Sequence, residues 1–75
     1  MNKQRRKAIM EISKKIEVIA QSLKDVLDEE QDAFDNMPEG LQSSDRGIDS
    51  ESAQESIESA IEHLEDAILE LEEIC

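Results

Sequence analysis

Aromatic residues and cysteine are nearly absent from this chain of 75 residues, which holds one of each, Phe34 and Cys75. A lone cysteine cannot form an intrachain disulfide or a cysteine-based metal site, and such sparing use is typical of a reducing compartment. With one aromatic ring, the chain offers no stacking platform for nucleic-acid bases. We therefore expect a cytoplasmic protein that folds without covalent or metal cross-links.

Long hydrophobic runs are missing as well. No segment approaches the roughly 20 apolar residues that span a bilayer. The first residues, Met1 to Ile12, carry charge and lack the continuous apolar stretch of a secretory signal peptide. We therefore expect an unprocessed chain with no membrane partner.

Residues that carry out chemistry are scarce too. The chain has one histidine, His63, and Ala60 stands where a Glu-x-x-His metal motif would need its glutamate. A zinc-protease motif, a phosphate-binding glycine loop and a nucleophile elbow are all missing. His63 is therefore interpreted as a polar residue at the boundary of a core. We expect a protein that is not an enzyme, with no catalytic residues, no metal and no cofactor.

Apolar residues recur at alternating spacings of three and four, which is typical of a coiled-coil helix. With Ile9 at heptad position a, the first half fills a and d, and Glu30 interrupts the a row. A further apolar row at e widens the stripe, as expected for a helix with more than one neighbour. The a and d residues are Ile9, Ile12, Ile16, Ile19, Leu23 and Val26, and the e residues are Ala20, Leu27 and Phe34. The pattern predicts a helix over about residues 3–35, with Glu30 frayed toward solvent.

The second half repeats this period with smaller residues. With Ile57 at a, Leu64 and Leu71 also fall at a, and alanine recurs at d. The d residues are Ala53, Ala60, Ala67 and Ile74, and the e residues are Ile61, Ile68 and Cys75. A row of alanines lets a neighbouring helix approach closely. The pattern predicts a helix over about residues 50–74 that packs on an antiparallel partner.

The segment between the two helices, residues 36–49, holds the only proline and both glycines. Proline disfavours helical geometry in the residue before it, and Pro-Glu-Gly is typical of a turn. This segment is therefore the expected loop. Ser52 with Glu55 fits a capping box at the start of the second helix. The earlier candidates for that cap are Ser44, Asp49 and Ser50.

Apolar residues within the loop have two interpretations. Met37, Leu41 and Ile48 are expected to fold down beside Phe34 and plug the end of the bundle. Alternatively, Met37, Pro38 and Leu41 form a small docking surface for a host protein.

Charge is strongly segregated along the chain. Residues 1–24 carry seven Lys/Arg and two Glu, residues 25–75 carry one Arg and eighteen Asp/Glu, and the net charge is −12. Basic residues at a helix start and acidic residues at a helix end both oppose the helix dipole. An antiparallel hairpin brings the basic start beside the acidic end, so the charge pattern favours that arrangement.

These patterns predict an all-α fold with one domain over residues 1–75, an antiparallel helical hairpin. A lone hairpin cannot cover three apolar rows on both helices, so we expect a homodimer that forms a four-helix bundle. Cys75 is expected near Ile9 as a small apolar cap. The expected core is Ile9, Ile12, Ile16, Ile19, Leu23, Val26, Leu27, Phe34, Ile57, Ala60, Ile61, Leu64, Ala67, Ile68, Leu71 and Ile74.

Acidic residues outnumber the cations that could neutralise them. One interpretation is a solvated face that keeps a small bundle in solution. The other is that carboxylates imitate nucleic-acid phosphates and occupy a basic surface on a host protein, such as a defence nuclease. The second interpretation predicts a protein-interaction module that blocks a nucleic-acid-binding or defence protein. Its expected binding residues, called the acidic stripe here, are Glu51, Glu55, Glu58, Glu62, Glu65 and Asp66.

The opposite charge gathers in a basic arm, which consists of Lys3, Arg5, Arg6 and Lys7. Dimeric helical hairpins of the Rop type, which control plasmid copy number, bind RNA along a helical face. The net charge disfavours nucleic acid as a partner over most of this surface. An RNA-binding hairpin and a structural or assembly protein of a virion are the alternatives that stay open.

The segment from Phe34 to Ser44, which reads Asn-Met-Pro-Glu-Gly-Leu-Gln at positions 36–42, is followed by a Glu/Leu/Ala pattern from Ala60 to Ile68. Together they resemble a group of small acidic proteins of bacteria and their phages that share an Asn-Met-Pro-Glu-x-Leu-Gln loop between two helices. The resemblance covers about residues 28–74 and implies a helical hairpin of phage origin, with no associated activity. Gly40 and Gly47 depart from the pattern.

Overall fold

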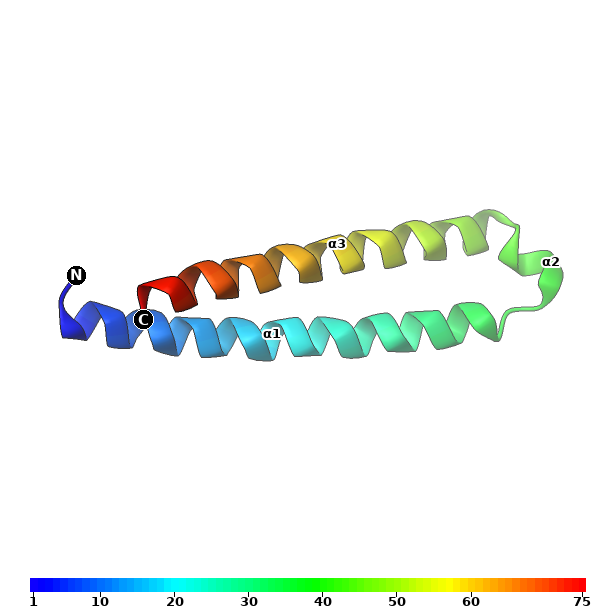
Figure 1. The fold of residues 1–75 in the computed structure, drawn as a ribbon. Coiled ribbons are helices and arrows are strands. Elements are labelled where there is room, and N and C mark those ends of the chain that lie inside the picture. The colour runs from blue at the N-terminus through cyan, green and yellow to red at the C-terminus, as the bar shows by residue number, and fades with distance from the viewer.

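The computed structural model describes residues 1–75 as three helices, α1 (Lys3–Asp35), α2 (Glu39–Gln42) and α3 (Asp45–Ile74). The two long helices lie side by side and antiparallel, and α2 turns the chain between them (Figure 1). The result is a thin rod of 58 × 14 × 12 Å. The predicted all-α antiparallel helical hairpin is confirmed. None of the helices combines the length and the apolar character that a membrane crossing would need.

Helix α1 has the predicted bounds. Asn2 caps its start, because the side-chain Oδ1 accepts a hydrogen bond of 2.8 Å from the backbone N–H of Arg5. At its end, the N–H of Asn36 donates to the carbonyl of Asp32 at 3.0 Å. The helix stops there because Pro38 disfavours helical geometry at Met37.

Helix α3 begins five residues earlier than the expected position, at Asp45 instead of about residue 50. Its N-cap is Ser44, with extended backbone angles of φ −82° and ψ 175°. The capping box of Ser52 and Glu55 was wrong as a start signal, since both residues lie inside the helix. The early start depends on Gly47, because a Cβ atom there would overlap the main-chain carbonyl of Gln42 at the end of α2.

The contact between α1 and α3 uses heptad positions a and e, not a and d. The buried and half-buried residues of the a/e seam are Ile9, Ser13, Ile16, Ala20, Leu23, Leu27, Glu30 and Phe34 on α1, and Gly47, Ser50, Gln54, Ile57, Ile61, Leu64, Ile68 and Leu71 on α3. Small residues of α1 face large residues of α3. Ala20 lines the same groove as Ile68, and Ser13 lines the next groove with Leu71. This size complementarity lets the helices approach closely along a and e.

Most of the expected core lies on or beside this seam. Ile9, Ile16, Leu23, Leu27, Phe34, Ile57, Ala60, Ile61, Leu64, Ala67, Ile68 and Leu71 are buried or half-buried. The other four residues of the list are not covered by the hairpin itself. Ile12, Ile19, Val26 and Ile74 are 50%, 53%, 48% and 39% exposed in the hairpin. All four occupy position d, which lies to one side of the seam.

Glu30 does not fray toward solvent, so that expectation was wrong. It is half-buried in the seam, where one carboxylate oxygen accepts a hydrogen bond of 3.1 Å from the hydroxyl of Ser50. Gln54 donates to the same hydroxyl at 3.2 Å. These polar groups satisfy one another across the two helices, and this favours one register of the hairpin over shifted ones.

The apolar loop residues form only part of a plug. Met37 is half-buried, whereas Leu41 and Ile48 are 41% and 58% exposed, so the expected plug was wrong for these two. The side-chain amide of Gln42 instead closes this end by donating a hydrogen bond of 3.1 Å to the carbonyl of Phe34. The hydrogen bond from Gln42 to Phe34 and the close approach of Gly47 to the main chain of Gln42 therefore hold the turn in place.

The substitution Leu41→Ser is expected to change the free energy of unfolding by less than about 1 kcal/mol, because the side chain is already largely in solvent. Met37→Ser, at a half-buried position of the same turn, should cost more. Thermal unfolding followed by circular dichroism measures both. A larger loss for Leu41→Ser than for Met37→Ser would show that Leu41 is a plug after all.

Candidate interaction surface

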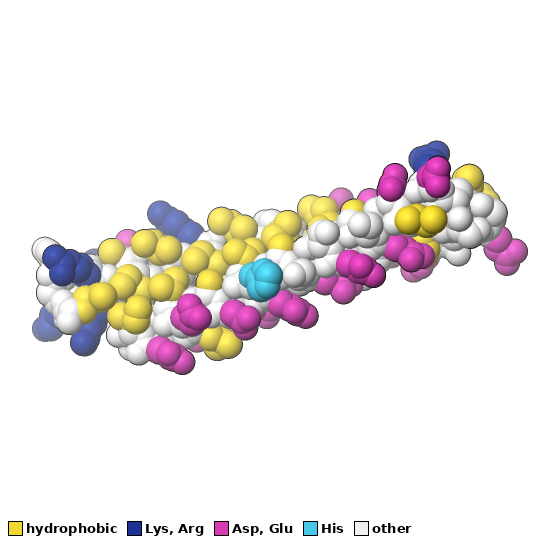
Figure 2. Space-filling view, turned by 90° about the horizontal axis from the view of Figure 1, so that it is seen from above, with side chains coloured by type: hydrophobic (Ala, Val, Ile, Leu, Met, Phe, Trp, Pro, Cys, Tyr) yellow, Lys and Arg dark blue, Asp and Glu magenta, His cyan; other side chains and the backbone are white.

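The six residues of the acidic stripe lie together on α3. They occupy heptad positions b, c and f, which fall within a sector of about 100° at about 100° per residue. Every one of them is exposed. In Figure 2, acidic side chains follow the lower edge of the hairpin, while hydrophobic side chains follow much of the upper edge. The structure therefore brings the predicted stripe together on one side of α3.

The spacing within the stripe is regular. Successive glutamates from Glu51 to Glu65 are four and three residues apart by turns. A rise of about 1.5 Å per residue places their Cα atoms about 5 Å apart along the axis, over roughly 21 Å. The result is a line of negative charge along the rod instead of a compact cluster.

Neutralisation of the stripe is slight. The only salt bridge of the structure joins Lys24 Nζ to Glu65 Oε1 at 3.8 Å, and both side chains are about half exposed, 46% and 52%. Exposed ion pairs of this kind contribute about 0–1 kcal/mol. The other five carboxylates of the stripe have no cation within 4 Å. They are free to interact with a basic surface.

The basic arm lies at the opposite end of the rod from α2. Its four residues are exposed and form the first turns of α1. They are spread over more than half of the helix circumference at about 100° per residue, so they form no single stripe. Cys75 reaches this end, where its thiol contacts the carbonyl of Arg6 at 3.5 Å. The cysteine lies close to the expected Ile9, but it is exposed instead of forming an apolar cap.

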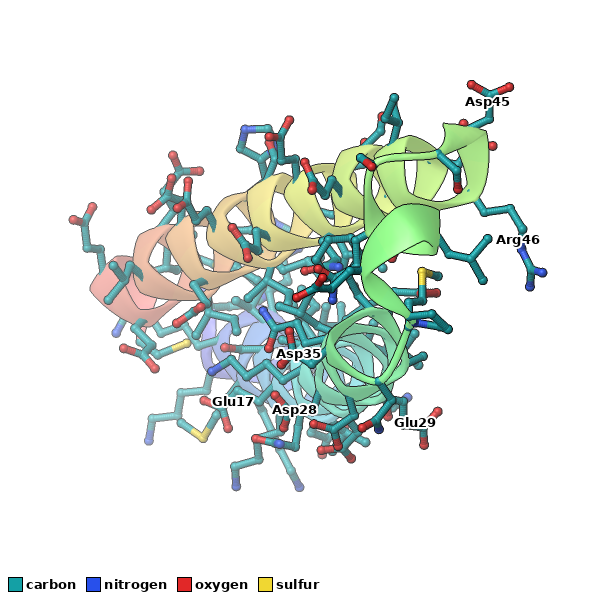
Figure 3. The ribbon with its side chains drawn as sticks, turned by 90° about the vertical axis from the view of Figure 1, so that its right-hand side faces the viewer. Glu17, Asp28, Glu29, Asp35, Asp45 and Arg46 are labelled. Carbon is teal, nitrogen blue, oxygen red and sulfur yellow. The ribbon has the colours of Figure 1, made fainter.

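The loop end of the rod is acidic on several sides. Figure 3 looks onto this end and shows Asp28 and Glu29 projecting from α1, with Asp45 on the far side of α3. Arg46 points away from these carboxylates, and no ion pair neutralises them. The loop end therefore carries negative charge of its own, outside the acidic stripe.

The hairpin has shallow grooves between its helices. The largest has a volume of about 360 Å³ and is lined by Glu17, Ala20, Gln21, Lys24, Glu65, Ile68 and Leu69. No group of three or more His, Cys, Asp or Glu side chains is arranged to hold a metal ion. The notable surface features are thus lines of charge and of apolar side chains along the helices.

These features define the protein as an all-helical hairpin with one acidic edge. No protein-family model matches the chain, and neither a curated protein nor a solved structure has detectable similarity to it. Its function is therefore argued from its own residues.

Proposed function

We propose that this chain is a non-enzymatic interaction module, a homodimeric four-helix bundle of the bacterial cytoplasm whose acidic stripe binds a basic surface of a nucleic-acid-binding host protein. The observation that carries this proposal is the line of exposed carboxylates on α3, five of which have no cation within 4 Å. A basic groove that neutralises phosphates attracts such a line by the same electrostatics. Bound in that groove, the rod would exclude nucleic acid and thereby inhibit the host protein.

The homodimer is the second element of the proposal. A chain of this size has a small core, and a single core below about 80 residues rarely supplies more than about 3–5 kcal/mol. Only six residues of the hairpin are buried, and no large side chain is completely enclosed. A second copy would cover apolar side chains that the hairpin leaves in solvent.

The test removes the charge of the stripe without changing its shape. A variant with Glu58→Gln, Glu62→Gln, Glu65→Gln and Asp66→Asn is expected to lose capture of its partner from a nuclease-treated bacterial lysate. The loss should be at least tenfold at moderate salt, because several charge contacts disappear together. Duplex DNA should displace the partner from the unmodified protein, since the two ligands compete for one surface.

The matched control carries the same change of charge on α1. Its substitutions are Asp28→Asn, Glu29→Gln, Asp32→Asn and Asp35→Asn, all at exposed positions. This variant should keep its partner. If both variants bind equally well, or if DNA displaces nothing, the stripe is only a solvated face. If structured RNA shifts in a gel and the shift disappears when the basic arm is changed to glutamine, the RNA-binding alternative replaces the proposal.

A further inference from the structure

An apolar row remains in solvent on each long helix. On α1 the row consists of Ile12, Ile19 and Val26, which are 50%, 53% and 48% exposed. On α3 it consists of Ala53, Ala60, Ala67 and Ile74, of which Ala53 and Ile74 are exposed and the two central alanines half-buried. Successive members are seven residues apart. These seven side chains, at position d of both helices, are called the d face.

Both rows lie on the same side of the hairpin. Position d is about 80° from the middle of the a/e seam on each helix, at about 100° per residue. Because α1 and α3 are antiparallel, this rotation carries both rows to one face of the pair. Figure 2 shows hydrophobic side chains gathered along one edge of the rod, over the half that holds the chain ends. The acidic stripe flanks the opposite side of the seam.

The centre of the d face is free of charged residues. Its two central levels join Ile19 of α1 to Ala67 of α3 and Val26 of α1 to Ala60 of α3, in the register set by the contacts of Ser13 with Leu71 and of Glu30 with Ser50. Ser22 and His63 hold the g positions between these levels, and Ala33 continues the row of α1 opposite Ala53. The row on α1 runs from Ile12 to Ala33 and the row on α3 from Ala53 to Ile74, each about 32 Å at about 1.5 Å per residue. With a width of two helices, about 18 Å, this strip covers roughly 570 Å², at the lower end of what each partner buries in a specific interface.

We infer that the d face is where a second copy of this chain packs, with the two hairpins antiparallel so that their loops lie at opposite ends. This inference rests on the proposed homodimer and specifies its interface. A twofold axis passes midway between the two central levels, near Ser22 and His63, and places α1 on the partner's α1 and α3 on the partner's α3.

Side-chain sizes match in this arrangement. The two central layers each contain Ile19 and Ala67 of one copy with the partner's Val26 and the partner's Ala60. In the two outer layers, Ile12 and Ile74 of one copy meet the partner's Ala33 and the partner's Ala53. Every layer therefore combines two branched side chains with two alanines, which fills the space between four helices without voids or overlap. The alanines let the two α3 helices approach closely.

Charge selects the opposite-end orientation. The loop half, residues 21–63, carries two Lys/Arg and thirteen Asp/Glu, whereas residues 1–20 and 64–75 together carry six and seven. Loops at the same end would put the two strongly acidic halves side by side. Loops at opposite ends put the start of α1, with six Lys/Arg and two Glu, beside residues 21–35 of the partner, with one Lys and six Asp/Glu. The two α1 helices attract each other, while the two α3 helices remain acidic on both sides, so the total repulsion is lower than with loops at the same end.

Neighbouring residues supply a matched test of the d face. Ile19→Glu places two carboxylates in the central layers of the interface, whereas Val18→Glu changes an exposed residue, 67% in solvent, that lies outside the face. Light scattering should give twice 8.5 kDa for the unmodified chain and for Val18→Glu, and 8.5 kDa for Ile19→Glu. Circular dichroism should show that Ile19→Glu stays helical at high protein concentration. Ala60→Glu, with Ser59→Glu as its control, repeats the test on α3.

Orientation is measured with a spin label on Cys75. Loops at opposite ends should separate the two labels by about 35 Å, whereas loops at the same end should bring them within about 20 Å, at about 1.5 Å per residue. A dimer with the short distance overturns the orientation. A dimer that survives Ile19→Glu and Ala60→Glu overturns the interface but leaves the homodimer intact. A monomeric unmodified chain overturns both, and capture of a host protein by the acidic stripe remains a separate result.

Discussion

The substitution Gly47→Ala is expected to destabilise the protein by about 1–3 kcal/mol, because a Cβ atom at this position has no room. It would overlap the main-chain carbonyl, carbonyl carbon and Cα of Gln42, none of which can move without displacing α2. Either α2 detaches from the first turn of α3 or that turn unwinds. Thermal and urea unfolding at a fixed protein concentration would measure the loss.

Gly40→Ala is the control, and it should have the opposite sign. Gly40 lies in α2, and nothing stands within 4 Å of where its Cβ would be. Alanine there favours the helix and lowers the entropy of the unfolded chain, so stability should rise by about 0.4–1 kcal/mol. If Gly47→Ala were also stabilising, α2 would not be seated on α3 as described.

The substitution Ile61→Ala should cost about 2–4 kcal/mol, since it empties the most buried large position of the seam. Ile61 is 6% exposed. A small core supplies only a few kcal/mol in total, so the variant should be largely unfolded at 37 °C. Circular dichroism at 222 nm, with the variant and the unmodified protein at equal concentration, would report the loss of helix, because helix formation here depends on packing.

Two companions calibrate this result. Ile61→Val retains most of the side chain and should cost about 0.5–1.5 kcal/mol. Leu69→Ala removes as many side-chain atoms as Ile61→Ala. Because Leu69 is 60% exposed, its cost should nevertheless stay below about 1 kcal/mol. Equal losses at positions 61 and 69 would contradict the a/e seam.

The choice of seam shows where sequence reasoning reaches its limit. Rows a, d and e are all largely apolar, and both a/d and a/e satisfy the alternation of three and four. The e row begins with Ser13 and Ala20, which argue against a core position when α1 is considered alone. Their small size is favourable only beside Leu71 and Ile68, and that match depends on the register of the two helices.

The register in turn depends on the loop. Helix α3 begins at Asp45, several residues earlier than the loop composition suggested, because Gly47 sits inside the helix and not before it. Glu30 was misjudged for a related reason, since its partner Ser50 was placed at a helix start and not in the seam. Bounds of α1 and membership of the acidic stripe were predictable, because both follow from local periodicity.

The neutralisation of charge was beyond local patterns. Antiparallel packing does bring the basic start of α1 to the acidic end of α3, yet the single ion pair of the structure forms elsewhere, between Lys24 and Glu65. Which exposed side chains pair depends on small differences of reach across the seam. The sequence could therefore predict an unneutralised negative surface without predicting its one neutralised carboxylate.

The meeting of Cys75 with Arg6 has a practical consequence for experiments on a solid support. Both termini emerge at one pole of the rod, so a tether on either terminus attaches the molecule by the same pole. A single hairpin immobilised in this way would stand upright, with α2 farthest from the support and the helices accessible along their 58 Å length. Partners that approach from solution would then meet the negatively charged pole first.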